Sequence, residues 1–354
     1  MDNIKIHFRE EQGKNFLDEI RRGHFLFSFV ISYTKTCEIS GITFAGADKE
    51  SIKYTPPADA EFLHYGFCKT IRGIPMTPDG KPSPALLTKT ALDSASIPHF
   101  VINAGSVVPP KLPYFFTGLS EGRNIEDEEA LDSESFVQAL DYGRIVGRSL
   151  ASVTDCLIIG ESIPGGTTTA LGVLRGLGYD AKVSSSIPNN PVELKKQVVE
   201  KALTRLDSKD PSSIVTKMGD PMIPFVAGML STASEIGRVI LAGGTQMAAV
   251  VALGNHLKFK AENVAICTTS YIINDDSANF VELVKQISSI PVISIDPKLD
   301  LSKIDGINAF SKGFAKEGVG AGGALIAASI KTGMDTNNFI KRIEKEHERV
   351  STLQ

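Results

Sequence analysis

The chain has 354 residues, of which 42% are hydrophobic and 22% are charged, and its formal net charge is −4 at pH 7. This length can bury a substantial core in one large or two modest domains, and the composition is that of a soluble globular protein. The acidic balance argues against nucleic acid or an anionic membrane as a partner.

The N-terminus and the cysteines indicate a cytoplasmic protein. The opening MDNIKIHFREEQ is charged from its second residue and does not resemble a signal peptide, and no apolar stretch is long enough to span a bilayer. The four cysteines lie far apart with no pair at zinc-ligand spacing, so we expect reduced thiols.

The N-terminal third gives a mixed pattern. Lys14 to Arg22 is expected to form a short helix, and Phe25 to Tyr33 (FLFSFVISY) a strand covered on both faces. Gly41 to Ala47 is expected to be a short strand or turn. Prolines and glycines recur from Tyr54 to Pro84, so regular structure should be sparse there. That segment is interpreted as a lid-like loop, as part of a flanking subdomain, or as a surface connection without a role.

From residue 98 onward, strands and helices are predicted to alternate. Short apolar runs predict strands at Phe100–Asn103, Cys156–Gly160, Ala181–Ser184, Val239–Ala242, Val264–Cys267 and Val292–Ile295. Helices are expected at about 133–151, 167–178, 192–206, 221–236, 245–257, 277–288 and 320–332. This alternation predicts an α/β fold with an open, mostly parallel sheet and helices on both faces.

Small, hydrogen-bonding residues follow most of the predicted strands. Because the carboxyl ends of parallel strands line one crevice, we expect them to form a pocket for a polar ligand. These endings are Asn103–Ser106, Gly160–Ser162, Ser184–Ser186, Gly243–Gly244–Thr245 and Thr268–Thr269–Ser270.

The stretch DCLIIGESIPGGTTT predicts a strand, a glycine-containing loop and a helix start. Gly165 and Gly166 allow close approach of a ligand, and Thr167 is a candidate N-cap, so the helix start is a candidate anion site. Glu161 would repel a polyphosphate, and Gly166 stands where a Walker A loop has lysine. We therefore predict a site for a single phosphate with chemistry beside it.

A second glycine-bracketed glutamate, Glu317, precedes an alanine-rich helix in GFAKEGVGAGGA. One interpretation is a flexible turn with an ion pair to Lys316. The other is a carboxylate held against a ligand, where burial would raise its pKa and suit it to act as a general base. Lys195 is either a further cation for phosphate or a solvated helix residue.

Other common catalytic patterns are missing from the sequence. It contains no dinucleotide-binding Gly-x-Gly-x-x-Gly after a strand and no HExxH pair.

Five stretches in the same order resemble the nicotinate-nucleotide–dimethylbenzimidazole phosphoribosyltransferase family, from about Asn103 to about Ala327. They are NAGSV with GLSEGRNI, DCLIIGESIPGGTTTALGVL, IPNNPVELKKQVVEKAL, RVILAGGTQMAAVVAL and EGVGAGGAL. The resemblance implies a Rossmann-like core, taken as residues 98–330, and a smaller flanking subdomain from residues 1–97 and 331–354. It also implies a homodimer.

The resemblance implies transfer of phosphoribosyl from nicotinate mononucleotide to a benzimidazole-like base, giving an α-ribotide for the lower ligand of cobamides. Glu317 would be the catalytic base, and no cofactor or metal is required because the leaving group is already a pyridinium. Substrate-binding roles are expected for Glu161, Gly165, Gly166, Thr167, Lys195, Gly243, Gly244, Ser270 and Gly318.

The chain differs from this family at several points. Its phosphate loop reads Ser162-Ile163-Pro164-Gly165-Gly166 instead of Gly-x-Gly-Asn, and Ala242 stands where the family often has aspartate. The N-terminal third does not match the benzimidazole-binding segment. These differences indicate a divergent branch. A non-catalytic nucleotide or ribotide sensor is the alternative function, and an NAD-linked oxidoreductase is a weaker one.

Overall fold

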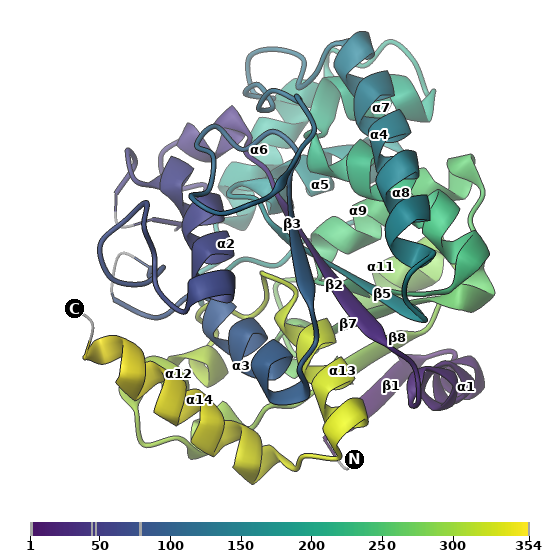
Figure 1. The fold of residues 1–354 in the computed structure, drawn as a ribbon. Helices are drawn as coiled ribbons and strands as arrows, with labels where there is room; N and C mark the ends of the chain where they lie inside the picture. Colours follow the sequence, from purple (N-terminus) through teal and green to yellow (C-terminus); the bar gives the residue numbers. More distant parts are fainter. Residues whose placement is uncertain (1–2, 44, 47, 78–79, 353–354) are drawn as a thin grey trace.

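The computed structural model describes residues 3–43, 45–46, 48–77 and 80–352. This part of the chain forms an eight-stranded sheet in the order β1-β8-β7-β6-β5-β2-β3-β4, in which only β1 is antiparallel to its neighbour (Figure 1). The strands are β1 (Ile4–Phe8), β2 (Phe25–Ile31), β3 (His99–Asn103), β4 (Phe115–Phe116), β5 (Cys156–Ser162), β6 (Arg238–Ala242), β7 (Val264–Thr269) and β8 (Val292–Ile295).

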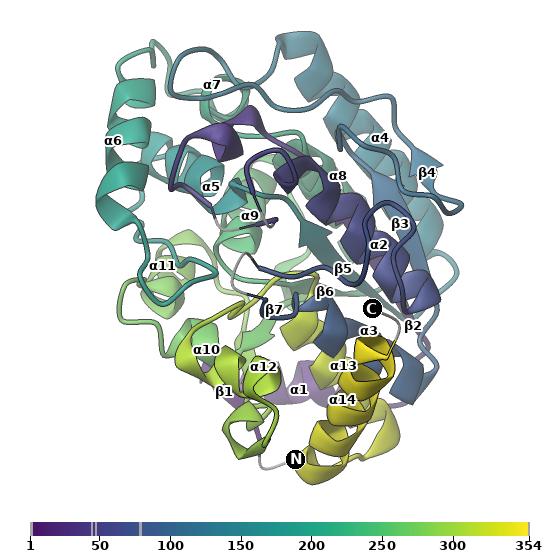
Figure 2. The same ribbon diagram turned by 90° about the vertical axis from the view of Figure 1, so that its left-hand side faces the viewer.

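Helices cover both faces of the sheet (Figures 1 and 2). One hydrophobic core contains residues of α4 (Ser133–Ala151), α5 (Gly166–Gly176), α6 (Val192–Leu203), α7 (Pro211–Met218), α8 (Met222–Ile236), α9 (Thr245–Leu257) and α11 (Phe280–Ile287). The other contains residues of α1 (Glu10–Ile20), α2 (Thr55–Tyr65), α3 (Ala85–Ala95), α12 (Asp305–Asn308), α13 (Ala321–Thr332) and α14 (Thr336–Ser351). None of the helices in the described ranges is long and apolar enough to cross a membrane.

The strand β2 shows why its sequence is almost continuously apolar. All seven of its residues are buried. Leu26 and Val30 join the core of α4 and α8, whereas Phe27 and Phe29 join the core of α3 and α13. Side chains of a strand alternate between the two faces of a sheet, so a strand covered on both faces needs apolar residues at every position.

The fold class predicted from the sequence is confirmed. The predicted strands are present as β2, β3 and β5 to β8, and each helix expected from residue 133 onward is present with small shifts at its ends. The helix expected at Lys14–Arg22 is α1, which starts earlier, at Glu10. Of the stretch Gly41 to Ala47, residues 44 and 47 lie outside the described residues, and the others form no strand.

The strand predicted at Ala181–Ser184 is wrong. These residues form no strand and pair with none in the described part of the sheet, where β5 pairs directly with β6. Their apolar pattern instead reflects packing, since Ala181 and Val183 are buried in the same core as α5.

The expectation of sparse regular structure from Tyr54 to Pro84 is also wrong at its start, where α2 spans Thr55–Tyr65. Pro56 and Pro57 lie in the first turn of α2, where the backbone N–H groups have no helical acceptor and proline costs little. Proline there marks a helix start and not a loop.

The proposed division at residue 98 stays a prediction. The strands β1 and β2 come from the first 97 residues and belong to the same sheet as the later strands. Residues on both sides of the boundary therefore contribute to the sheet.

Two long helices, α4 and α8, pack closely through glycine. A Cβ atom on Gly143 would overlap the carbonyl oxygen of Phe225, and one on Gly147 would overlap the backbone of Met229. The obstacle at both positions is helical backbone, which cannot rotate away as a side chain can.

We therefore predict that Gly143→Ala destabilises the protein by about 2–3 kcal/mol, despite the higher helix propensity of alanine, because the two helices must separate. Urea unfolding measures this change. Ser149→Ala, at an exposed position of the same helix, should change stability by less than about 0.5 kcal/mol. Equal stabilities of Gly143→Ala and the parent protein would contradict the close packing.

Candidate active site

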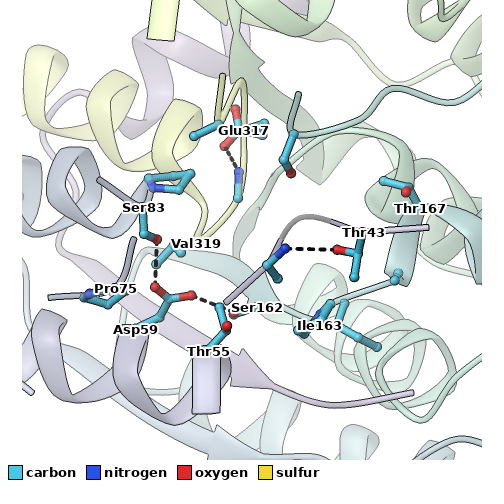
Figure 3. Close-up of a pocket in the computed structure, with 18 of the residues that line it drawn as sticks. Thr43, Thr55, Asp59, Pro75, Ser83, Ser162, Ile163, Thr167, Glu317 and Val319 are labelled. Carbon is cyan, nitrogen blue, oxygen red and sulfur yellow. Dashed lines mark hydrogen bonds between the residues drawn. The ribbon is translucent and has the colours of Figure 1, made fainter. Parts of the chain in front are cut away.

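A cavity of about 840 Å³ lies at the carboxyl end of β5 (Figure 3). Its walls come from the end of β5, the start of α5, the loop at Ser185 and Ser186, the loop before α13 and the N-terminal segment that contains α2. A smaller cavity of about 360 Å³ also contains Glu161, Thr167, Glu317 and Gly318 in its lining, and extends to Gly244 and Ile272.

The two glutamates that the sequence singled out meet in this cavity. Glu161 and Glu317 line both cavities. The loop that carries Glu317 is joined to β5 directly, since the Val319 N–H donates to the Glu161 carbonyl oxygen at 2.9 Å. Two motifs far apart in the chain are therefore held together by a backbone hydrogen bond.

Glu161 is a buried acid at the end of β5, with only 3% of its surface exposed. Burial, followed by the negative charges of Asp220 and Glu317, raises the pKa of Glu161 to about 8. At neutral pH its neutral form therefore predominates, and the side chain can exchange a proton with a ligand.

Glu317 is held by four hydrogen bonds. One oxygen, Oε2, accepts from the Thr269 N–H at 2.8 Å and the Thr268 hydroxyl at 3.1 Å. The other, Oε1, accepts from the N–H groups of Gly322 (3.1 Å) and Gly318 (3.2 Å). Burial raises the pKa of Glu317, while these donors oppose the rise by favouring the ionised form. The carboxylate is thus fixed in place at the start of α13.

Glycines let α13 approach the strands closely enough to place Glu317. A Cβ atom on Gly322 would overlap the backbone of Thr268, and one on Gly323 would overlap the side chain of Ala242. Gly320 has φ +68° and lies against Gly160 of β5. The run GVGAGG is therefore required by packing against β5, β6 and β7.

Lys316 does not pair with Glu317. Its ammonium group lies 2.6 Å from a carboxylate oxygen of Asp275, and both side chains are buried. The interpretation of Glu317 as an exposed ion-pair partner of Lys316 is therefore wrong. Glu317 is instead half-buried and lines the cavity.

The start of α5 forms one wall of the cavity with Gly165, Gly166 and Thr167. The helix begins at Gly166 and its cap is Gly165 in the left-handed conformation, so Thr167 is not the N-cap but lies in the first turn. A Cβ atom on Gly165 would lie about 3.0 Å from atoms of Cys37. Glycine at position 165 can adopt the positive φ and leaves room for Cys37.

Three of the residues predicted to bind substrate do not line either cavity: Lys195, Gly243 and Ser270. The Lys195 ammonium group is buried and donates to the Ser184 carbonyl oxygen at 2.8 Å and to Asn190 Oδ1 at 3.0 Å. Burial lowers its pKa to about 7. Lys195 thus supports the loop whose Ser185 and Ser186 line the cavity.

The sequence did not reveal the contribution of α2. Thr55 and Asp59 lie four residues apart on this helix and both line the cavity, opposite Ser162 and Ser83. A helix start recognised from Pro56-Pro57 would have placed these two side chains on one face.

Neither cavity is lined by Lys, Arg or His within the described residues. Those residues also contain no group of three or more His, Cys, Asp or Glu able to hold a metal.

The raised pKa of Glu161 predicts a pH-dependent effect of Glu161→Gln. Between the ordinary pKa of about 4.5 and about 8, folded Glu161 retains a proton that the unfolded chain releases, so wild-type stability falls as pH rises through this window. Glutamine does not titrate. Urea unfolding should therefore show the variant gaining stability relative to wild type from pH 5 to pH 8.5, by on the order of 2 kcal/mol. Glu262→Gln, at an exposed position, serves as the control. A stability difference between Glu161→Gln and wild type that does not change with pH would contradict the raised pKa of Glu161.

Comparisons with known proteins point to one family. A family model described as a phosphoribosyltransferase matches residues 99–272. The chain is 48% identical to a UPF0284 protein of Archaeoglobus fulgidus, covering 94% of this chain and 96% of that protein. It is 42% identical to a UPF0284 protein of Sulfurisphaera tokodaii, covering 92% and 94%.

Two solved structures share its fold. One is the nicotinate-nucleotide–dimethylbenzimidazole phosphoribosyltransferase from Thermus thermophilus, with a TM-score of 0.56 and 18% identity over 87% of this chain and 83% of that one. The other is CobT from the same organism, with a TM-score of 0.58 and 16% identity over 91% and 95%. The chain belongs to the UPF0284 family and shares the fold of these two structures.

Proposed function

We propose that this protein is a cytoplasmic pentosyltransferase that moves phosphoribosyl from nicotinate mononucleotide to a benzimidazole-like base, giving an α-ribotide and nicotinate for cobamide lower-ligand synthesis. The observation that carries the proposal is the meeting of Glu161 and Glu317 in one cavity beside the start of α5. Family membership supports the general reaction.

The reaction is a single displacement at C1′ of the ribose. A ring nitrogen of the base attacks C1′ with its lone pair, the bond from C1′ to the pyridinium nitrogen breaks, and its electron pair neutralises the leaving nicotinate ring. Positive charge develops on the ribose in the transition state. Asp59, Glu161 and Glu317 line the cavity, and the ionised carboxylates among them stabilise such a charge.

The attacking base must then lose its N–H proton, and Glu317 is proposed to accept it. Each oxygen of Glu317 already accepts two hydrogen bonds, so a lone pair must be freed first. Of the four donors, only the Thr268 hydroxyl can rotate away, because the other three are backbone N–H groups. Glu161 lies close enough for the charge of Glu317 to raise its pKa.

The 5′-phosphate is proposed to lie at the start of α5. With no cationic side chain among the described lining residues, the phosphate would be bound by the Thr167 N–H and hydroxyl and by the dipole of α5. The nearby carboxylates disfavour a more highly charged polyphosphate.

Glu317→Gln is predicted to lower kcat at least 100-fold, because general-base catalysis contributes about 10²–10⁴. The assay incubates the protein with nicotinate mononucleotide and a panel of azole and purine bases, and detects ribotide and nicotinate by mass. The amide will also face a backbone donor, so a stability loss of about 1–3 kcal/mol is expected and is measured in parallel.

Glu262→Gln, far from the cavity, should keep the wild-type rate. Wild-type activity in a folded Glu317→Gln variant would remove Glu317 from the mechanism. Nucleotide binding without nicotinate release, whichever base is offered, would indicate the sensor function instead.

The homodimer is also a proposal. An exposed aromatic cluster at the sheet edge supports it: Phe116 is 74% exposed, and Phe100 and Phe115 are each exposed by more than 40%. The rings of Phe100 and Phe115 lie close together, with their centroids 5.6 Å apart, and Phe116 follows Phe115 in β4. Light scattering should give twice the chain mass, and Phe116→Asp should shift it towards the monomer; a monomeric wild type would contradict the proposal.

A further inference from the structure

A second carboxylate site lies at the far side of the cavity from the start of α5. Figure 3 shows Asp59, Pro75 and Ser83 on one side of the cavity and Thr167 on the other. If the phosphate occupies the Thr167 side, as proposed above, the opposite side is left for the base. Asp59 is therefore placed to contact the acceptor and not the phosphate.

Asp59 retains hydrogen-bonding capacity that the protein does not use. Its Oδ1 accepts from the Ser83 hydroxyl at 2.7 Å and its Oδ2 from the Ser162 hydroxyl at 2.8 Å. A carboxylate has about four lone-pair directions, so one remains on each oxygen. Burial raises the pKa of Asp59 to about 6, and the two hydroxyl donors oppose this rise. Above pH 6 the ionised form, which only accepts hydrogen bonds, therefore predominates.

The surroundings of Asp59 suit a flat ring. Pro75, Met76, Pro84 and Val319 line the same cavity and present apolar surface. A sugar carries a hydroxyl on most carbons and would need several polar partners. A heteroaromatic ring with one donor group on its edge matches apolar walls around a single carboxylate.

We propose that Asp59, fixed by Ser83 and Ser162, selects the acceptor base; this inference rests on the proposed function. The preferred acceptor is a benzimidazole-like base whose six-membered ring carries an N–H or O–H donor, in preference to one that carries methyl groups. A methyl group against Asp59 would leave the remaining lone pairs of this buried carboxylate without water or a donor, which is costly. This deepens the proposed function by naming the substrate class.

The test compares 5-aminobenzimidazole with 5-methylbenzimidazole, which have nearly the same shape and differ in the donor. With nicotinate mononucleotide as the second substrate, wild type should prefer the amino base in kcat/KM by about 10- to 100-fold, the range expected for one hydrogen bond to a charged group. Asp59→Leu should abolish or reverse this preference. Asp59→Asn, which keeps the shape and the serine contacts, should reduce it and covers the case in which Asp59→Leu does not fold.

Asp220→Asn is the matched control. Asp220 is fully buried and accepts from Thr169 and Ile223, but it lines neither cavity. Its substitution is free to change the overall rate, through its charge near Glu161, but should leave the preference between the two bases unchanged.

The outcomes separate this inference from the transferase proposal. Ribotide formation with both bases at equal kcat/KM, or with the methyl base preferred, overturns the role of Asp59 and leaves the transferase intact. An equal rise in KM for nicotinate mononucleotide with both bases in Asp59→Leu also overturns it, because Asp59 then holds the ribose.

If neither base forms a ribotide, the transferase proposal fails. Calorimetric titration of the two bases in the presence of inorganic phosphate then tests whether Asp59 selects the bound base. Tighter binding of the amino base to wild type, lost in Asp59→Leu, supports it. Equal binding overturns it.

Discussion

The close contact between the glycine-rich start of α13 and the carboxyl ends of the central strands is the constraint on which the site depends. Val319 donates its backbone N–H to Glu161, and Gly320 lies against Gly160. Any side chain at Gly322 would push α13 away from β7. This packing brings two carboxylates together and anchors one of them with backbone donors, before any ligand binds.

The second consequence is electrostatic. Three carboxyl groups share a cavity whose described lining has no cationic side chain. Burial raises the pKa of both Glu161 and Asp59, and repulsion from neighbouring negative charges adds to the rise at Glu161. A ligand with positive charge relieves this repulsion. A pyridinium nucleotide, and still more an oxocarbenium-like transition state, is such a ligand, so the repulsion among the carboxyl groups favours the charge that the reaction generates.

Much of the fold was predictable from the sequence. The alternation of apolar runs and helical periodicity indicated the parallel sheet, and the bracketing glycines marked Glu161 and Glu317 as residues of one site. Local patterns could not distinguish the buried, non-strand segment at Ala181 from a strand, because burial alone makes a segment apolar. They also indicated a loop at Pro56-Pro57, so α2 and its cavity residue Asp59 were missed.

Lys195 was a candidate phosphate ligand, yet its ammonium group donates to Ser184 and Asn190. Tertiary structure brings these two partners to Lys195, and local sequence patterns do not reveal such contacts.

We propose that the start of α5 and the two glutamates form one nucleotide site, and a crystal structure with nicotinate mononucleotide bound would reveal it. The phosphate is expected on the N–H and hydroxyl of Thr167, and the C1′ atom in the cavity facing Glu161 and Glu317. A nucleotide bound elsewhere, or bound with its phosphate against Asp59, would contradict it.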